Sequence, residues 1–536
     1  QTKQLLMATI SPCEFSLSPP PYVALLFLLG GYLGEVSGTT LTLQSFPSDI
    51  LTSRNALCLD GSAGKFYWSP SSSGSTRWVI FLQGGGACAT FGSCFTRSTT
   101  ELGTSKTLSA DITLNGILAS SQSANPVFYD ANKVYIPYCD GFFFLGNRGA
   151  VSESGDTLYF QGRSIVQATL DTLIRNYNLA SATEVLLTGE SAGGVGTLLS
   201  AGIVKTRLPV GAVFKVAPFS GFFLARNSFN GAQGRVLNVL SLGLTLHGAS
   251  PLPNNDCVTA GNSDRFCAAP NNTYAYLTIP SFIVNSYVDG VDFAEFVTGS
   301  SFEGRTCYGD ESQQLANCNQ EEIDVARQYK DYFLADLTNS PGYSRNGNGA
   351  FIFSCYEHAK SWTEPTFTTY VVASTQLTLA LSSWFLSSND PPANHQYMDC
   401  ALGNPPSVSC NPSCAVGAPI PPTPPPTAFP TGFSVGTPSP ATPSPLPPGV
   451  SSMPTVSPTS TPIIASTPTA SPSIPGGSGS DNSNGSSNSG VNAGIAVGTI
   501  CGAAAILALA YCVYKRNPPK KNAIQMSDRS ELGARI

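Results

Sequence analysis

The chain has 536 residues, of which only 11% are charged, and its formal net charge is −6. This balance offers no basic patch for binding nucleic acid. The length leaves room for several domains, and the composition changes along the chain, so segments of different kinds are expected.

The N-terminal residues 1–38 form a predicted signal-peptide region. Their apolar run, residues 22–34, is too short for an ordinary membrane span, and the small residues typical of a cleavage site follow it at 36–38. An uncleaved membrane anchor is the alternative interpretation. Secretion would place the downstream cysteines in an oxidising compartment, where cysteines pair.

Residues 39–416 are predicted to form one α/β domain. Strands are predicted at residues 77–82, 133–138 and 281–286, and helices at 164–177 and 321–334. Pro137 suggests that the second of these strands lies at a sheet edge or ends at the proline. The alternation of strands and helices favours a mostly parallel sheet that is covered by helices on both faces.

The five residues 189–193, GESAG, stand between an apolar run at 185–188 and a small-residue segment at 194–199. Strand, sharp turn and helix are the context that a nucleophile elbow of the form G-x-S-x-G requires. The turn holds the Ser191 hydroxyl away from the sheet, and the glycines let the strand and the helix cross closely. The backbone N–H of Ala192 then faces a developing oxyanion. A chance match is the alternative in a chain with 51 glycines.

A serine nucleophile needs a base and an acid that orients the base. The chain has three histidines, His247, His358 and His395. In α/β-hydrolases the order is serine, acid and then histidine, which favours His358, since His247 precedes the acid and His395 lies in a polar, proline-flanked stretch. Asp289 directly follows a predicted strand and is the expected acid, with Asp292 as the fallback. The glycines at 84–86, after the strand at 77–82, are expected to supply a second oxyanion donor.

Twelve of the fifteen cysteines fall in the globular part of the chain, which allows as many as six disulfides. Short spacings nominate Cys88–Cys94, Cys257–Cys267 and Cys307–Cys318. The pairing of four others stays open: Cys355, Cys400, Cys410 and Cys414. A zinc site is disfavoured by the few histidines and the lack of paired C-x-x-C units, so we expect neither a metal nor a cofactor.

The remaining segments predict a single-pass type I membrane protein with its catalytic domain outside the cell. Residues 417–490 are rich in Pro, Ser, Thr and Gly and are expected to form a disordered stalk. Residues 491–514 are an uncharged stretch of membrane-spanning length, and the basic residues of the tail at 515–536 place that end in the cytoplasm. This polar tail argues against a lipid-anchor signal.

Two further patterns are glycosylation sequons and a regular spacing of glycines. Asn271 and Asn484 stand in glycosylation sequons. Gly494, Gly498 and Gly502 recur every four residues in the apolar stretch, which fits either pairing of two such helices or the ordinary abundance of glycine in membrane spans.

The motifs of the domain resemble those of the pectin acetylesterase family, which includes the Notum-type deacylases. The resemblance covers nearly all of residues 50–415. It rests on motifs in register at 84–88 with Cys94, 138–141, 189–194, 221–224, 282–286 with Asp289, 354–358 and 410–414. Membership would imply an α/β-hydrolase-like fold stabilised by disulfides, one of them Cys58–Cys139. It would also imply a catalytic triad of Ser191, Asp289 and His358, with oxyanion donors from the backbones of Gly86, Ala87 and Ala192.

The chain departs from the family pattern at two positions. Ala87 stands where the family usually has Trp, and Phe219 stands where it tends to have Asp. Both changes bear on the substrate more than on catalysis, because a backbone donor survives a change of side chain. Neighbouring aromatics would have to fill the gap that the missing indole leaves: Phe91, Phe142, Phe143, Phe144 and Phe219. Glu190 gives the elbow a likeness to type-B carboxylesterases, which are larger and whose other motifs do not fit.

The sequence therefore predicts an extracellular serine carboxylesterase that removes acetyl esters from a pectin-like cell-wall or extracellular polysaccharide. The first alternative is a Notum-like deacylase of a lipidated secreted protein. The second is a catalytically inactive cell-surface binding module.

Overall fold

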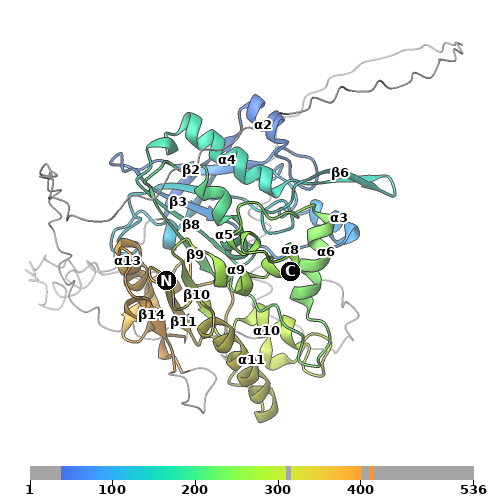
Figure 1. Cartoon of the computed structure of the whole chain (residues 1–536), viewed down its shortest axis with the longest axis vertical. Helices are drawn as coiled ribbons and strands as arrows, with labels where there is room; N and C mark the ends of the chain where they lie inside the picture. Colours follow the sequence, from blue (N-terminus) through green and yellow to red (C-terminus); the bar gives the residue numbers. More distant parts are fainter. Residues whose placement is uncertain (1–37, 310–314, 401–409, 415–536) are drawn as a thin grey trace, which may run out of the picture. The chain divides into compact units, whose positions relative to one another are not determined.

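The computed structural model describes residues 38–309, 315–400 and 410–414 (Figure 1). The predicted signal region apart from Gly38, the stalk, the membrane span and the cytoplasmic tail lie outside these residues, as do Asn484 and the three regularly spaced glycines. Within the described ranges, no helix is both long enough and apolar enough to cross a membrane.

A ten-stranded sheet forms the centre of the domain, in the order β14-β11-β10-β9-β8-β3-β5-β2-β1-β4. Its strands are β1 (Thr39–Ser45), β2 (Lys65–Ser69), β3 (Arg77–Leu82), β4 (Asp111–Leu114), β5 (Asn132–Ile136), β8 (Glu184–Glu190), β9 (Val213–Phe219), β10 (Phe282–Ser286), β11 (Gly349–Phe353) and β14 (Gln396–Met398). The strands from β14 to β5 pair in parallel, and β2, β1 and β4 continue the sheet in antiparallel fashion. Two hairpins lie apart from it: β6 (Arg148–Glu153) with β7 (Asp156–Phe160), and β12 (Val371–Val372) with β13 (Thr375–Gln376). The prediction of a mostly parallel sheet is confirmed.

Helices cover both faces of this sheet (Figure 1). The α-helices are α2 (Ser48–Arg54), α3 (Phe91–Ser98), α4 (Gly162–Asn176), α5 (Ala192–Lys205), α6 (Arg235–Leu246), α7 (Asp256–Thr259), α8 (Asp264–Cys267), α9 (Pro270–Tyr276), α10 (Gly290–Val297), α11 (Gln320–Thr338), α12 (Thr366–Thr369) and α13 (Leu377–Leu386). Side chains of α4, α5, α6, α10 and α11 belong to the larger core, and those of α12 and α13 to the core on the opposite face.

Strand β3 explains why these strands read as continuous apolar runs. Successive side chains of a strand point to opposite faces, so Ile80 and Leu82 enter the larger core while Val79 and Phe81 enter the other. Because helices cover both faces, every one of these positions is apolar.

The element boundaries differ from the predicted ones by a few residues. Pro137 follows directly after the end of β5, so the prediction that the strand ends at this proline is confirmed. The alternative prediction of a sheet edge is wrong, because β5 lies between β3 and β2. Helix α11 continues to Thr338 and begins at a capping box, in which Asn319 accepts from the N–H of Glu322 and Glu322 accepts from the N–H of Asn319. The antiparallel strands β1, β2 and β4 were not expected.

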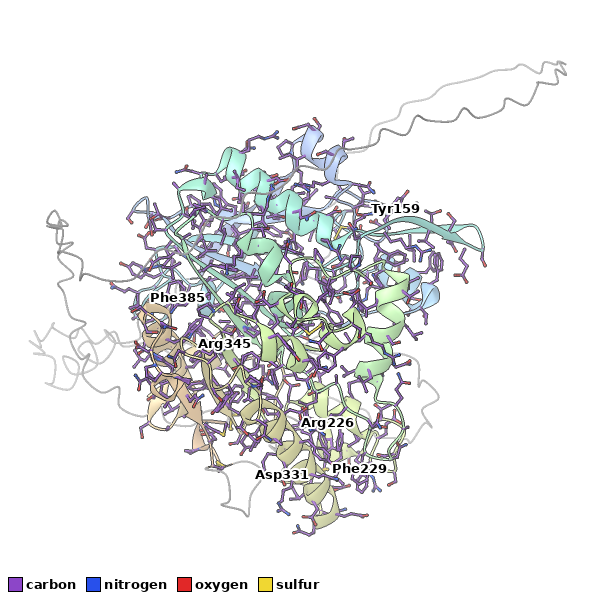
Figure 2. The ribbon with its side chains drawn as sticks, viewed as in Figure 1. Tyr159, Arg226, Phe229, Asp331, Arg345 and Phe385 are labelled. Carbon is purple, nitrogen blue, oxygen red and sulfur yellow. A yellow bond between two sulfur atoms is a disulfide. The ribbon has the colours of Figure 1, made fainter. Side chains whose placement is uncertain are left out.

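Six disulfides tie the domain together: Cys58–Cys139, Cys88–Cys94, Cys257–Cys267, Cys307–Cys318, Cys355–Cys414 and Cys400–Cys410. Figure 2 draws such bonds in yellow among the side chains of the domain. The three pairs nominated by spacing and the pair implied by the family resemblance are all present. The last two bonds join the four cysteines whose pairing the sequence left open.

Candidate active site

Ser191 lies at the sharp turn between strand β8 and helix α5. Its backbone has a φ of 54° and a ψ of −122°, and its N–H donates to the carbonyl oxygen of Phe219 at 2.9 Å. A methyl group at Gly189 would lie only 2.6 Å from the carbonyl oxygen of Leu82, and one at Gly193 would lie closer still to the same oxygen. The glycines of the motif are therefore required by close packing, and the serine conformation is the strained one that the elbow predicts.

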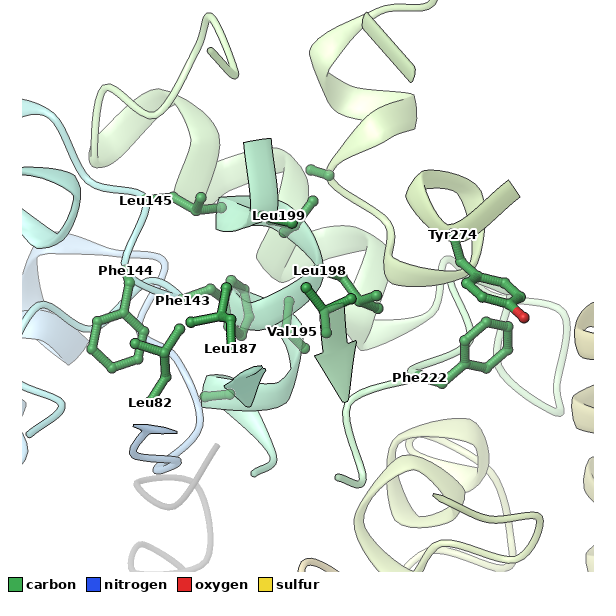
Figure 3. Close-up of a cluster of buried hydrophobic side chains, with 14 of the residues drawn as sticks. Leu82, Phe143, Phe144, Leu145, Leu187, Val195, Leu198, Leu199, Phe222 and Tyr274 are labelled. Atoms are coloured by element: carbon green, nitrogen blue, oxygen red, sulfur yellow. The ribbon is translucent and has the colours of Figure 1, made fainter. Parts of the chain in front are cut away.

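Helix α5 is fixed behind the serine by its apolar side chains. Val195, Leu198 and Leu199 belong to a buried cluster that also contains Leu187 of β8 and Phe143 (Figure 3). Because these contacts fix the helix against the sheet, the first turn of α5 and Ser191 keep one position relative to the strands.

Ser191, His358 and Asp289 form one hydrogen-bonded chain. The Nε2 atom of His358 is 2.8 Å from the Oγ of Ser191, and its Nδ1 is 2.8 and 2.9 Å from the two carboxylate oxygens of Asp289. An ionised carboxylate only accepts, so Nδ1–H donates to Asp289 and the neutral Nε2 accepts from the serine hydroxyl. Asp289 is held in turn, because its Oδ1 caps α10 by accepting from the N–H groups of Val291 and Asp292 at 3.1 Å. The structure thus brings together three residues that are far apart in the sequence.

The surroundings of His358 favour its charged form. The side chain is only 14% exposed, and burial on its own lowers the pKa of the imidazole. The Asp289 carboxylate outweighs this effect, with smaller contributions from Glu357 and Glu190, and holds the pKa of His358 above its ordinary value of 6.5. The site therefore stabilises an imidazolium beside Ser191.

The loop after β3 offers backbone donors to the same space. Gly85 and Gly86 have φ values of 141° and 69°, a conformation that favours glycine. The N–H of Gly84 donates to Oε1 of Glu190 at 2.8 Å, and the hydroxyl of Tyr138 donates to the carbonyl of Gly86 at 2.7 Å. These bonds hold the loop in place.

The expected oxyanion donors have no competing partner. In the part of the chain that the structure describes, the N–H groups of Gly86, Ala87 and Ala192 donate to no other protein group. All three residues line the cavity that contains Ser191 and His358. Their N–H groups are therefore free to donate to a substrate oxygen beside the serine.

That cavity has a volume of about 350 Å³. Its apolar lining comprises Leu102, Phe143, Val195, Phe223, Val236, Val239, Leu240, Pro270 and Val291. Two carboxyl side chains, Glu190 and Glu295, also line it. Cavities of this size and character hold apolar ligands whose few polar contacts fix their orientation.

The fallback acid and the two rejected histidines have partners other than Ser191 and His358. Asp292 accepts from the Tyr329 hydroxyl at 2.6 Å and from the N–H of Leu224 at 3.0 Å. His247 is fully buried beside the Cys88–Cys94 disulfide, and burial lowers its pKa to about 3. His395 pairs with Asp390 at 3.4 Å.

The two departures from the family pattern have different surroundings. Ala87 is 6% exposed and lines the cavity, whereas Phe219 belongs to the core on the opposite face of the sheet, where it packs against Phe367. Of the aromatics expected to fill the missing indole's space, Phe143 lines the cavity. The cavity wall formed by α6 and Glu295 is not predicted by the sequence, because α6 is apolar on most of its faces and Glu295 belongs to no motif.

Two groups of side chains have the spacing of metal ligands among the described residues: Cys88, Cys94 and His247, and Cys307, Cys318 and Glu322. All four cysteines are in disulfides, so neither group offers a thiolate.

Asn271 lies half-buried in α9, and its Nδ2 donates to Asp336 at 3.2 Å. Its glycosylation stays a prediction.

The chain is similar to pectin acetylesterases over most of its globular part. The family model described as Pectinacetylesterase matches residues 44–415. Pectin acetylesterase 4 of Arabidopsis thaliana is 30% identical over 377 residues, which are 67% of this chain and 85% of that protein. Pectin acetylesterase 11 of the same plant is 28% identical over 365 residues, 67% of this chain and 90% of the relative.

A second group of similar proteins matches over a shorter stretch. The human palmitoleoyl-protein carboxylesterase NOTUM is 36% identical over 162 residues, 30% of this chain and 32% of its own. Among solved structures, the Wnt deacylase Notum from Drosophila superposes with a TM-score of 0.56 at 21% identity, over 68% of this chain and 100% of that one. This likeness shows a shared fold.

Proposed function

Because the chain belongs to the pectinacetylesterase family and is a carboxylic ester hydrolase, we propose that it hydrolyses esters through a catalytic triad of Ser191, His358 and Asp289. The observation that carries the proposal is the unbroken hydrogen-bonded chain from the serine hydroxyl through the imidazole to the carboxylate. An inactive binding module has no need of such an arrangement beside a strained serine.

The first half-reaction forms an acyl-enzyme. The Oγ of Ser191 attacks the ester carbonyl carbon while its proton passes to Nε2 of His358. Asp289 keeps the imidazole in the reactive tautomer and stabilises the imidazolium. Negative charge develops on the carbonyl oxygen, which accepts hydrogen bonds from the N–H groups of Gly86, Ala87 and Ala192. The intermediate then collapses, and His358 returns the proton to the departing alcohol.

The second half-reaction releases the acid. A water molecule gives a proton to Nε2 of His358 and attacks the acyl carbonyl, and the same backbone donors hold the oxyanion. Collapse of this intermediate breaks the bond to Ser191, whose oxygen recovers the proton from His358. The described residues supply every proton transfer in this scheme.

The first substrate candidate is an acetyl ester of a pectin-like polysaccharide outside the cell. It is supported by relatives named pectin acetylesterases that match the chain over 85% and 90% of their length. With it we propose the type I topology expected from the sequence, in which the stalk holds the domain outside the membrane.

A longer acyl group is the second candidate, because a specific observation favours it. The cavity of about 350 Å³ is lined mostly by apolar side chains and far exceeds the space that one methyl group needs. The matching carboxylesterases named for palmitoleoyl-protein agree with a substrate of this kind.

Hydrolysis of p-nitrophenyl esters from acetate to palmitate by the full-length protein separates the two candidates, with Ser191→Ala as the control. The proposed function requires that the wild type cleaves at least one ester and that Ser191→Ala loses this activity. A maximum at acetate supports the polysaccharide, and a maximum at a medium or long chain supports the second candidate. Equal hydrolysis by Ser191→Ala would refute the proposed mechanism.

A further inference from the structure

The oxyanion loop, residues 84–88, is held at both ends and has few hydrogen bonds between them. At one end, the N–H of Gly84 donates to Glu190 at 2.8 Å. At the other, the N–H of Cys88 donates to a backbone carbonyl at 2.9 Å, and Cys88 is in a disulfide. Among the described residues, a single hydrogen bond reaches the peptide groups that join residues 85–87, and it comes from the hydroxyl of Tyr138.

Tyr138 follows strand β5 and is completely buried. Its N–H donates to Oε1 of Gln83 at 2.9 Å, and its ring packs against that of Phe144, with 5.0 Å between the ring centroids. Burial raises the pKa of its phenol, so the hydroxyl keeps its proton. Tyr138 does not line the cavity beside Ser191, so any effect on an ester must act through the loop.

The hydrogen bonds of the Tyr138 hydroxyl have assigned directions. Its oxygen lies 2.9 Å from the backbone nitrogen of Phe143, whose N–H can only donate. It lies 2.7 Å from the carbonyl oxygen of Gly86, which can only accept. The hydroxyl therefore accepts from Phe143 and donates to Gly86, and hydrogen bonds in such a chain polarise one another.

The carbonyl of Gly86 shares a peptide group with the N–H of Ala87. This peptide is trans, so its C=O and its N–H point in opposite directions. Because Tyr138 holds the oxygen, the N–H of Ala87 points away from Tyr138, and Ala87 lines the cavity. Side-chain packing adds little here, since residue 87 has only a methyl group and glycine at position 86 lets the peptide group rotate. Without the hydroxyl, such a rotation would turn the N–H away from Ser191.

We propose that Tyr138 is a positioning residue of the oxyanion hole, whose hydroxyl aims the N–H of Ala87 at the oxygen on which charge develops. The proposal rests on the proposed function, since it concerns the oxyanion that forms when Ser191 attacks. Removal of an oxyanion donor lowers kcat about 10²–10³-fold, so loss of the group that aims one donor is expected to lower kcat about tenfold to a hundredfold.

Tyr67 offers a matched control. It is 2% exposed, and its hydroxyl donates to the carbonyl of Ser109 at 2.8 Å. Neither Tyr67 nor Ser109 lines the cavity. Tyr138→Phe and Tyr67→Phe therefore each remove one buried hydroxyl bond to a backbone carbonyl, and only the first removes it from the oxyanion loop.

The test compares the full-length wild type with these two variants on a p-nitrophenyl ester that the wild type cleaves. Titration with a fluorophosphonate gives the concentration of competent serines, to which every rate is referred. An alkyl trifluoromethyl ketone then probes the oxyanion hole itself. The oxygen of Ser191 adds to its carbonyl carbon while His358 takes the proton, and the resulting oxyanion occupies the place of the one in the transition state.

Tyr138→Phe is expected to lower kcat about tenfold to a hundredfold and to weaken binding of the ketone by a similar factor, with KM nearly unchanged. The acid limb of its pH profile is expected to stay in place, because the contacts of His358 are retained. Tyr67→Phe is expected to keep the wild-type values even where its Tm falls as far. Wild-type kcat and ketone affinity in Tyr138→Phe, or equal losses in Tyr67→Phe, would overturn the positioning role alone. If the wild type cleaved no ester and escaped labelling, the proposed function itself would fail.

A second measurement decides the matter if Tyr138→Phe yields no competent serine. The variant Tyr138→3-fluorotyrosine keeps the hydroxyl, and its fluorine resonance is expected to shift when the ketone adduct forms, because the oxyanion then pulls on the peptide group to which this hydroxyl donates. The resonance of Tyr67→3-fluorotyrosine is expected to stay in place. An unchanged resonance at position 138 on formation of the adduct would overturn the proposal.

Discussion

Replacement of Asp289 by Asn is the perturbation whose outcome the geometry defines most fully. Both carboxylate oxygens lie within 2.9 Å of Nδ1 of His358. Asn can turn an N–H₂ group toward Nδ1, and the imidazole then carries its proton on Nε2, where it cannot accept from Ser191. The equivalent change in a serine protease lowers kcat about 10⁴-fold, or ~5.5 kcal/mol in activation free energy, and we expect a loss of this size.

The same substitution changes the pH dependence of the remaining activity. Asp289 is the main group that raises the pKa of His358, against burial, which lowers it. Without the carboxylate, burial dominates and the pKa of the imidazole falls. The base is then neutral at lower pH, so the acid limb of kcat/KM is expected to move to lower pH in Asp289→Asn.

Asp292→Asn is the matched control, three residues farther along the chain. Burial raises the pKa of Asp292 to about 8, so its carboxyl is largely neutral in neutral buffer. Its Oδ2 accepts from Leu224 and Tyr329, and the Asn carbonyl can do the same. We expect hydrolysis of a p-nitrophenyl ester to change only a few-fold, by analogy with other exchanges of neutral acceptors. A mild Asp289→Asn together with a severe Asp292→Asn would refute the assignment of the acid.

Three further predictions concern the base, the acyl pocket and the membrane topology. In the wild type, kcat/KM is expected to fall with decreasing pH along a limb centred above pH 6.5. The reason is that the raised pKa of His358 leaves this base protonated, and so inactive, below that limb. A limb centred below pH 6.5 would contradict this. Ala87→Trp is expected to shift the preferred acyl chain length, at roughly 1–3 kcal/mol per methylene. Reaction with a small organophosphate should persist, since the backbone N–H of residue 87 is retained. An unchanged preference in the ester series would mean that this side chain does not shape the acyl pocket. Protease added to intact cells is expected to cut the stalk and release an active fragment, and activity retained wholly inside sealed membranes would reverse the proposed topology.

The elements nearest the serine could be predicted because their signals are local. A strand, a glycine-flanked serine and a small-residue helix are consecutive in the sequence, and the packing of Gly189 and Gly193 shows why no larger residue fits. Asp289 could be found because the carboxyl ends of parallel strands lie at one edge of the sheet, next to the elbow. Cys88–Cys94 could be nominated because its partners are close in sequence.

The cavity wall could not be predicted, because its residues carry no motif. Helix α6 is apolar on most of its faces, and only the tertiary packing decides that Val236, Val239 and Leu240 meet the space beside Ser191. Glu295 reads in the sequence as an ordinary surface carboxylate. Disulfides between distant cysteines, such as Cys355–Cys414, have many possible connectivities that spacing alone does not resolve.

Ser191 is proposed to be the nucleophile of an ester hydrolase. This role is tested most directly by treating the full-length protein with a fluorophosphonate and locating the adduct by mass spectrometry of its peptides. We expect a single adduct on the Oγ of Ser191, absent in Ser191→Ala and formed far more slowly in His358→Ala. An adduct on another serine, or undiminished labelling of Ser191→Ala, would contradict it.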